Sequence, residues 1–468
     1  SVSSGSRPGQ SPDRLIMQQT AENKTIITNA MLINEESMRK ADVMIAGDRI
    51  AGIFPPGTAP SATGTRIIEA SGLWLLPGII DDHVHFREPG LTHKADIASE
   101  SAAAAAGGVT SFMEMPNTVP QTVTIEEWEK KNSLAAERSV INYAFYIGAT
   151  DSNIEELLRA DPERVPAFKL FMGASTGNML VSDQTTLEAI FRLKKIPVAC
   201  HCEDEKIIKA NIAAYREEYG EAIDPSFHPL IRSREAAYAS SSTAVALARK
   251  GGAKLHLLHL STAEETQLLT AGDNPAAKQI TGEACVHHLW FDDRAYADKG
   301  NLVKWNPPVR SASDRTALLK AVRDGRIDII ATDHAPHTLG EKSAPYFSAP
   351  SGGPTVQHSL VIMLELCHRG ELTPELVVRK MCHNPALLFG ITDRGFIREG
   401  LKADLVLVDP AAPWTVNKEN IMYKCGWSPL EGTTFRSSVV TTFVNGVPVF
   451  EEGRLTGRRT PEILLFKR

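Results

Sequence analysis

The chain has 468 residues, of which 43% are hydrophobic and 23% charged, values typical of a globular protein with a large core. Its 50 Lys and Arg against 56 Asp and Glu give a net charge of −6, which argues against nucleic acid as the main partner. No apolar run is long enough to span a membrane, so no membrane partner is expected, and six scattered cysteines without a CxxC pair favour a reduced, cytoplasmic protein.

Strand patterns occur at both ends of the chain. Residues 1–24 are rich in Ser, Gly, Pro and Arg, which predicts a disordered tail or a non-native extension with Met17 as the natural start. A pattern of short strands and turns follows. The same pattern occurs near the other end of the chain, where Asn445-Gly446 is a strong hairpin signal. We therefore expect residues 25–76 and 393–468 to form one small β-sandwich domain.

Residues 77–392 alternate apolar strands with helical patterns. Eight strand candidates lie at 75–85, 109–115, 141–149, 167–173, 196–203, 254–260, 278–285 and 327–333. Apolar strands that alternate with helices indicate a parallel sheet buried on both faces, and eight of them predict an α/β fold with a (β/α)8 TIM-type barrel. The third and seventh strands carry no residue that we assign to chemistry.

Two histidines stand at the carboxyl end of the first barrel strand, where barrel active sites are built. His83 and His85 are separated by one residue in DDHVHFREPG. On a strand this spacing puts both imidazoles on one face, where their nitrogens can converge on a divalent metal. The pair therefore predicts a metal site at this end of the barrel.

Further metal-capable residues lie at the ends of other strands. Lys169 interrupts the apolar strand AFKLFMG, where a buried ammonium must pair, lose its charge or be modified. His201, His259 and Asp333 end the fifth, sixth and eighth strands. His256, three residues before His259, is expected to face away and to be structural. Together with the histidine pair, these side chains predict one shared metal centre.

The predicted ligands outnumber one tetrahedral site. Four His, one Asp and one Lys suit two metals if a group bridges them. Lys169 carboxylated by CO₂ would supply one carbamate oxygen to each metal, and a water between the metals would be activated near neutral pH. Mixed nitrogen and oxygen ligands favour zinc, one or two ions per chain, with cobalt, manganese and iron as alternatives.

These features resemble the amidohydrolase superfamily over roughly residues 25–450. Within it, seven motifs are similar to those of dihydroorotases: DDHVHFREPG, MEMPNT, FKLFMG, HCE, HLLHLST, WNPPVR and ATDHAPH. Dihydroorotases are cyclic amidohydrolases that interconvert N-carbamoyl-L-aspartate and L-dihydroorotate in de novo pyrimidine biosynthesis. The resemblance implies two ligand sets, one of His83, His85, Lys169 and Asp333, the other of Lys169, His201 and His259.

The resemblance also implies roles around a small anionic substrate. As water attacks the ring amide, Asp333 would take its proton and return it to the departing nitrogen. Arg87 would hold the unreacting carboxylate in a bidentate fork, with Asn117 and His337 as further donors. Asn306 would touch the edge of the ring. The long loop 338–357, with Gly352-Gly353, is expected beside the site.

Alternatives stay open for the function and for Arg87. A sibling enzyme, allantoinase or hydantoinase/dihydropyrimidinase, would act on an uncharged ring and would have no use for a buried guanidinium. A non-catalytic scaffold would typically have lost metal ligands that this chain keeps. Arg87 could instead pair with the adjacent Glu88 or with another acidic residue at the surface. We expect a homodimer, and a complex with aspartate transcarbamoylase stays an open expectation.

Overall fold

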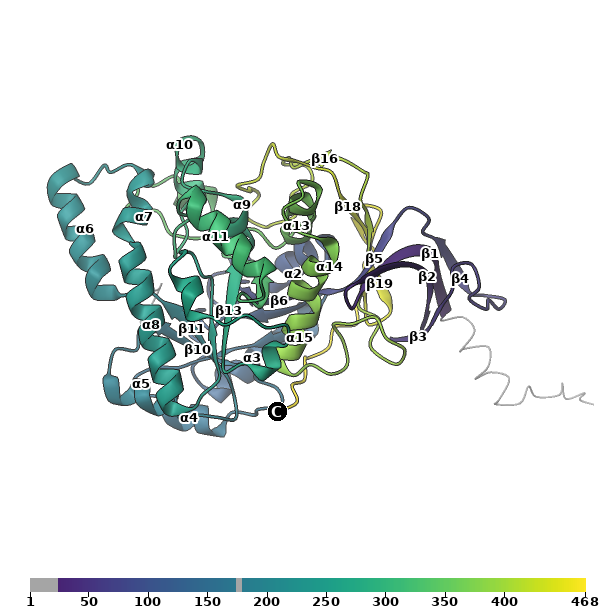
Figure 1. Cartoon of the computed structure of the whole chain (residues 1–468), viewed down its shortest axis with the longest axis horizontal. Helices are drawn as coiled ribbons and strands as arrows, with labels where there is room; N and C mark the ends of the chain where they lie inside the picture. The colour runs from purple at the N-terminus through teal and green to yellow at the C-terminus, as the bar shows by residue number, and fades with distance from the viewer. Residues whose placement is uncertain (1–23, 174–178) are drawn as a thin grey trace, which may run out of the picture.

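The computed structural model describes residues 24–173 and 179–468. The expectation of a tail or non-native extension at the start of the chain therefore lies almost entirely outside the described residues. The helices in these ranges include none with the length and hydropathy that a bilayer crossing requires. Figure 1 shows a barrel with its helices in one half of the molecule and a sheet, coloured purple and yellow, in the other.

The sheet joins strands from both ends of the chain, as predicted. Within the described ranges it has nine strands: β1 (Lys24–Asn34), β2 (Ser37–Ala46), β3 (Arg49–Phe54), β4 (Arg66–Glu69), β5 (Trp74–Pro77), β15 (Leu405–Asp409), β18 (Ser438–Val444), β19 (Val447–Glu451) and β20 (Arg454–Leu455). Their order is β20-β19-β18-β15-β5-β1-β2-β3, with β4 beside β1. Strand β5 runs parallel to β1 and antiparallel to β15, so the two chain ends meet at β5 and β15. The predicted turn at Asn445-Gly446 links β18 to β19, and both residues have positive φ.

Eight parallel strand positions form the barrel in the part of the chain that the structure describes. They are β6 (Ile79–Val84), β7 (Val109–Glu114), β8 (Asn142–Phe145) continued by β9 (Ile147–Gly148), β10 (Phe168–Met172), β11 (Val198–Cys202), β12 (Leu255–Leu257), β13 (Ile280–Cys285) and β14 (Ile329–Ala331). A parallel bridge between Val84 and His334 closes the ring from β14 back to β6. All eight predicted strands are thus present.

The first predicted strand, 75–85, is two strands that belong to different sheets. Pro77 ends β5 in the mixed sheet, and Ile79 begins β6 in the barrel. Gly78 lies between them, and a Cβ there would come within 2.0 Å of Thr110 Oγ1. This glycine therefore lets the chain pass from one sheet to the other against the neighbouring strand.

Helices cover the outside of the barrel (Figure 1). They are α2 (Ile97–Ala106), α3 (Ile125–Arg138), α4 (Ile154–Arg159), α5 (Gln184–Ile190), α6 (Glu205–Tyr219), α7 (His228–Ile231), α8 (Arg234–Gly251), α9 (Val286–Trp290), α10 (Ala295–Lys299), α11 (Ala312–Arg323), α12 (Leu339–Lys342), α13 (Ser359–His368), α14 (Pro374–Val378) and α15 (Asn384–Phe389). Helix α2 begins after Asp96, which caps Ser99 N at 2.7 Å. Its alanine run is buried, which lets α2 pack closely on β7 and β18.

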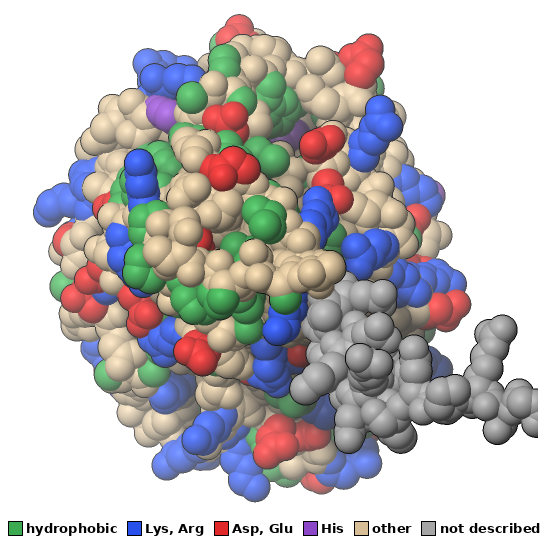
Figure 2. All heavy atoms as spheres, turned by 90° about the vertical axis from the view of Figure 1, so that its right-hand side faces the viewer, with side chains coloured by type: hydrophobic (Ala, Val, Ile, Leu, Met, Phe, Trp, Pro, Cys, Tyr) green, Lys and Arg blue, Asp and Glu red, His purple; other side chains and the backbone are tan. Residues whose placement is uncertain are grey.

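The second half of the chain also contacts the barrel outside the mixed sheet. Residues 416–433 connect the short strands β16 (Trp414–Thr415) and β17 (Thr434–Phe435). Within this connection, Trp427 Nε1 donates to His337 O at 2.8 Å. At the sheet end of the molecule, positive and negative side chains are interspersed over the visible face (Figure 2), in keeping with the modest net charge.

Candidate active site

The predicted site residues surround one cavity at the carboxyl ends of the barrel strands. Its volume is about 510 Å³ including the solvent at its mouth. Nine of the ten predicted residues line it: His83, His85, Arg87, Asn117, Lys169, His201, His259, Asn306 and Asp333. The tenth, His337, contacts Arg87 and lines an adjoining pocket that shares Arg87 and Asn117 with this cavity. The structure therefore brings together side chains that are up to 250 residues apart in the sequence.

Three of the predicted metal ligands point at one another. His83 Nε2 lies 3.0 Å and His85 Nε2 3.1 Å from the same oxygen, Asp333 Oδ1, and all three side chains are buried. Neighbouring ligand atoms around one divalent ion have such separations, because each lies ~2 Å from a zinc ion. This donor set fits a metal, as the sequence predicts.

The other predicted ligands lie beside this group. The ring centroids of His201 and His259 are 4.6 Å apart, and that of His259 is 5.2 Å from that of His83. Lys169 is 1% exposed, its Nζ lies 4.7 Å from the ring centroid of Phe171, and burial lowers its pKa. Among the described residues no carboxylate lies within ion-pairing distance of this ammonium. A buried lysine in such surroundings fits the predicted carboxylation, which would remove its charge.

Three site residues have a left-handed backbone, which is uncommon outside glycine. The φ angles are 71° at Arg87, 35° at His259 and 49° at Asp333. Each of them follows the carboxyl end of a barrel strand, namely β6, β12 and β14. Strained backbone of this kind clusters at functional sites, because the surrounding structure holds the side chain in one direction.

Arg87 is buried and does not pair with Glu88. Its Nε donates to Pro336 O at 3.0 Å, and burial lowers its pKa to about 10, so the guanidinium stays charged at neutral pH. Glu88 instead pairs with Arg138. The alternative of an Arg87–Glu88 ion pair is therefore wrong, and Arg87 presents its charge at the cavity.

His337 lies against the end of the Arg87 side chain. Lys94 Nζ donates to His337 Nδ1 at 2.9 Å, and His337 Nε2 lies 2.9 Å from Ser351 O and 3.2 Å from Arg87 Nη2. A neutral ring protonated at Nε2 satisfies the first two contacts, and burial and the neighbouring cations lower the pKa of His337 well below its usual value. In this arrangement the proton of His337 faces a carbonyl rather than the cavity.

The rest of the cavity wall consists of amide side chains and of a backbone segment that approaches the cavity closely. Asn117 and Asn306 line the cavity with Trp305, and Asn306 Oδ1 is buried without a hydrogen-bond partner among the described residues. The predicted loop lies here too, because Gly352 lines the same cavity. A Cβ on Gly352 would come within 2.6 Å of Ala335 O, so only glycine lets this backbone approach.

Sequence reasoning missed a buried acidic group below the predicted metal ligands. Glu283, on the seventh strand, lies with Oε1 2.8 Å from His83 Nδ1. His256 does not face away, because its Nε2 lies 3.2 Å from Asp82 Oδ2 and 3.5 Å from Glu283 Oε2. Strand seven therefore does carry site chemistry, since Glu283 fixes the ring that offers Nε2 to a metal. A lone Glu in the otherwise uncharged stretch ITGEAC was the available signal.

Comparisons with known proteins agree with this geometry. The amidohydrolase family matches residues 74–449. The chain is 37% identical to a dihydroorotase of Halobacterium salinarum, over 84% of this chain and 90% of that protein. It is 30% identical to an allantoinase of Deinococcus radiodurans, over 92% and 96%.

The fold is also similar to solved structures. An L-hydantoinase (dihydropyrimidinase) from Arthrobacter aurescens superposes with a TM-score of 0.89 at 26% identity, covering 94% of this chain and 99% of that one. Family match, relatives and barrel architecture agree with one another. The chain belongs to the amidohydrolase family.

Proposed function

We propose that this protein is a dihydroorotase, which interconverts N-carbamoyl-L-aspartate and L-dihydroorotate in pyrimidine biosynthesis. The observation that carries the proposal is the buried guanidinium of Arg87 at the wall of a cavity that also contains His83, His85 and Asp333. A ring substrate with a carboxylate needs such a cation, whereas an uncharged ring does not. The dihydroorotases among its relatives support the same assignment.

The metal would be zinc, and the convergence of His83, His85 and Asp333 supports this. His83, His85, Asp333 and a carboxylated Lys169 would hold one ion, and Lys169 would share a second ion with His201 and His259. When bound, zinc would polarise the ring amide and lower the pKa of water. Glu283 would keep the His83 ring oriented for this purpose through their 2.8 Å contact.

The protein's own side chains would bind and orient the ring and move the proton. Asp333 would carry a proton between the attacking water and the ring nitrogen, and its carboxylate is aimed by contacts to His83 and His85. Arg87 would grip the unreacting carboxylate, with Asn117 beside it. Asn306, which lines the same cavity, would contact the edge of the ring. Such a remote grip places the amide within reach of the reacting groups.

A direct comparison of substrates tests this proposal. The zinc-loaded protein is assayed with dihydroorotate, allantoin, hydantoin and dihydrouracil under identical conditions. We expect kcat/KM for dihydroorotate to exceed the others by at least ~100-fold, because the uncharged rings offer Arg87 no carboxylate to bind. Faster hydrolysis of allantoin or of hydantoin would instead assign the protein to a sibling activity.

A further inference from the structure

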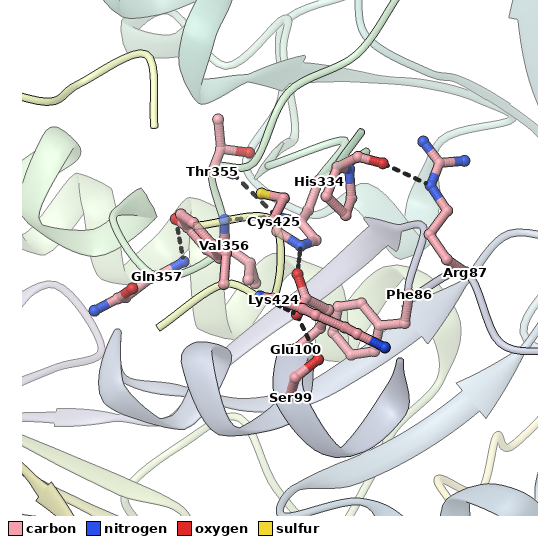
Figure 3. Close-up of polar contacts among 12 residues, drawn as sticks. Phe86, Arg87, Ser99, Glu100, His334, Thr355, Val356, Gln357, Lys424 and Cys425 are labelled. Carbon is pink, nitrogen blue, oxygen red and sulfur yellow. Dashed lines mark hydrogen bonds and ion pairs between the residues drawn. The ribbon is translucent and has the colours of Figure 1, made fainter. Parts of the chain in front are cut away.

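A buried histidine–glutamate pair lies beside the predicted metal ligands (Figure 3). His334 directly follows Asp333, and Glu100 comes from the first turn of α2. His334 Nε2 lies 2.9 Å from Glu100 Oε1, and both side chains are fully buried. Neither residue lines the cavity, so the pair lies one layer behind the predicted ligands.

Hydrogen bonds from the backbone fix the proton on this histidine. Thr355 N and Val356 N both donate to His334 Nδ1, at 3.0 and 3.2 Å. A nitrogen that accepts two bonds carries no proton, so the proton is on Nε2 and is donated to Glu100. The ring is therefore neutral, and hydrogen bonds at both of its nitrogens fix its orientation.

The glutamate is equally constrained at its second oxygen. Glu100 Oε2 accepts from Ser99 Oγ at 2.7 Å and from Lys424 N at 3.2 Å. Lys424 belongs to the 416–433 connection, and Figure 3 shows it next to Glu100. The carboxylate thus links helix α2, the connection near the C-terminal end and the end of strand β14.

His334 transmits this constraint to two predicted metal ligands. Its carbonyl accepts from His85 N at 2.7 Å, and its amide nitrogen follows Asp333, whose φ of 49° leaves the common backbone region. The His334 ring also packs edge-on to Phe86, with centroids 5.8 Å apart. The ring contacts hold the His334 backbone, and a displacement of that backbone would shift both His85 and Asp333, whose ligand atoms lie 3.1 Å apart.

We propose that Glu100 is a positioning residue, which acts through His334 to hold His85 and Asp333 at the spacing that a metal ion requires. The proposal rests on the metal-ligand roles given under the proposed function, and not on the identity of the substrate. Outer hydrogen-bond partners of this kind orient the ligands of metal sites generally.

The variant Glu100→Gln tests the role with little change in shape. An amide directs an N–H either at His334 Nε2–H or at Lys424 N–H, so one of the two donors loses its acceptor. We expect metal affinity or kcat to fall about 10–100-fold, with KM within about threefold of the original. Zinc affinity is measured by chelator competition on metal-free protein, and the visible spectrum of the cobalt form reports the ligand geometry.

Two matched variants separate positioning from general damage. Lys424→Ala removes the side-chain contacts of Lys424 with Thr92 O and Asp96 but keeps the N–H that Glu100 accepts. Ser99→Ala removes one donor and leaves the His334 bond intact. We expect both to bind zinc within about threefold of the unmodified protein, since neither breaks the link to His334.

A second variant decides the question if Glu100→Gln does not fold. In His334→Asn, the Asn oxygen replaces Nδ1 as acceptor for Thr355 N and Val356 N, but the side chain no longer reaches Glu100. We expect its loss of zinc affinity or kcat to equal that of Glu100→Gln. The double variant should lose no more than either single variant, because both substitutions break the same His334–Glu100 hydrogen bond. Normal zinc affinity and a normal cobalt spectrum in a folded single variant would overturn the proposal.

The metal measurements also keep this proposal separate from the substrate assignment. If the unmodified protein binds zinc but does not turn over dihydroorotate, the proposed function fails while the role of Glu100 is still decided. If dihydroorotate is turned over and Glu100→Gln matches the unmodified protein in both readouts, the role of Glu100 fails alone.

Discussion

At the scale of single residues, the site depends on backbone conformations that residues other than glycine rarely adopt. Arg87, His259 and Asp333 each have positive φ, at a cost of about 1–3 kcal/mol apiece. Contacts far away in the sequence offset this cost, such as the bond from Arg87 Nε to Pro336 O. Residue types predicted these three positions, but no local pattern could predict their conformation.

Replacing Arg87 tests the recognition of the substrate's carboxylate. In Arg87→Lys, the bidentate fork is lost while a positive charge remains, so we expect KM for dihydroorotate to rise about tenfold. In Arg87→Ala the rise should be larger, with the metal content unchanged. Steady-state kinetics and metal analysis check this, and an unchanged KM in Arg87→Ala would contradict the role.

Lys169→Ala tests whether this lysine bridges metals. The variant removes a side chain that is 1% exposed beside the cavity, and we expect it to lose at least half of its bound zinc. Short carboxylic acids should restore part of the metal and activity, because they can replace a carbamate in the space that the lysine leaves. Full metal content without such rescue would exclude the bridging role.

At the scale of elements, the strands were predictable and their supporting layer was not. Apolar runs located all eight barrel strands, because a parallel sheet buried on both faces requires them. The alternation could not indicate that Glu283 on β13 would meet His83 on β6, since strand order and rotation are set by the closed barrel. The role of Glu100 could not be predicted either, because its partner His334 is far away in the sequence and nothing in the alanine-rich segment of α2 indicates the contact.

The end of helix α2 gives a test of this supporting layer. A Cβ on Gly107 would come within 2.4 Å of Gln357 O, so Gly107→Ala must displace backbone. We expect the free energy of unfolding to fall by about 1–3 kcal/mol, measured by urea denaturation. Gly340→Ala in α12 is the control, because its Cβ meets nothing closer than 3.9 Å; equal effects in the two variants would contradict the close contact.

At the scale of the whole molecule, the barrel and the mixed sheet share a buried polar junction. Arg394 is 1% exposed, and its Nη1 donates to Asp404 Oδ2 and to Asn445 Oδ1, each at 2.9 Å. Asn445 Nδ2 donates in turn to Asn142 Oδ1 on barrel strand β8, at 2.8 Å. The hairpin residue Asn445, predicted from its turn signal alone, therefore also joins the two halves.

Arg394→Met tests how far this junction stabilises the protein. The variant leaves the buried carboxylate of Asp404 without its cation, so we expect a loss of about 3–5 kcal/mol in the free energy of unfolding. Zinc affinity should stay within about threefold, because Arg394 and its partners do not line the cavity. Arg398→Met is the control, since the Arg398–Glu35 pair is half exposed and such pairs contribute ~1 kcal/mol or less. A loss in Arg394→Met no larger than that in the control would contradict the role of the junction.

The meeting of the two chain ends at β5 and β15 also has a consequence in time. Pro77 ends β5, and Leu405 begins the strand that covers its open edge. A ribosome that adds ~5–20 residues per second needs roughly 20–60 s to make the stretch between them. During that interval each nascent chain exposes an unpaired strand edge, a template for wrong pairing with neighbouring chains. Slower translation lengthens the interval. The yield of correctly folded protein therefore depends on the rate of synthesis and on chaperones that shield this edge.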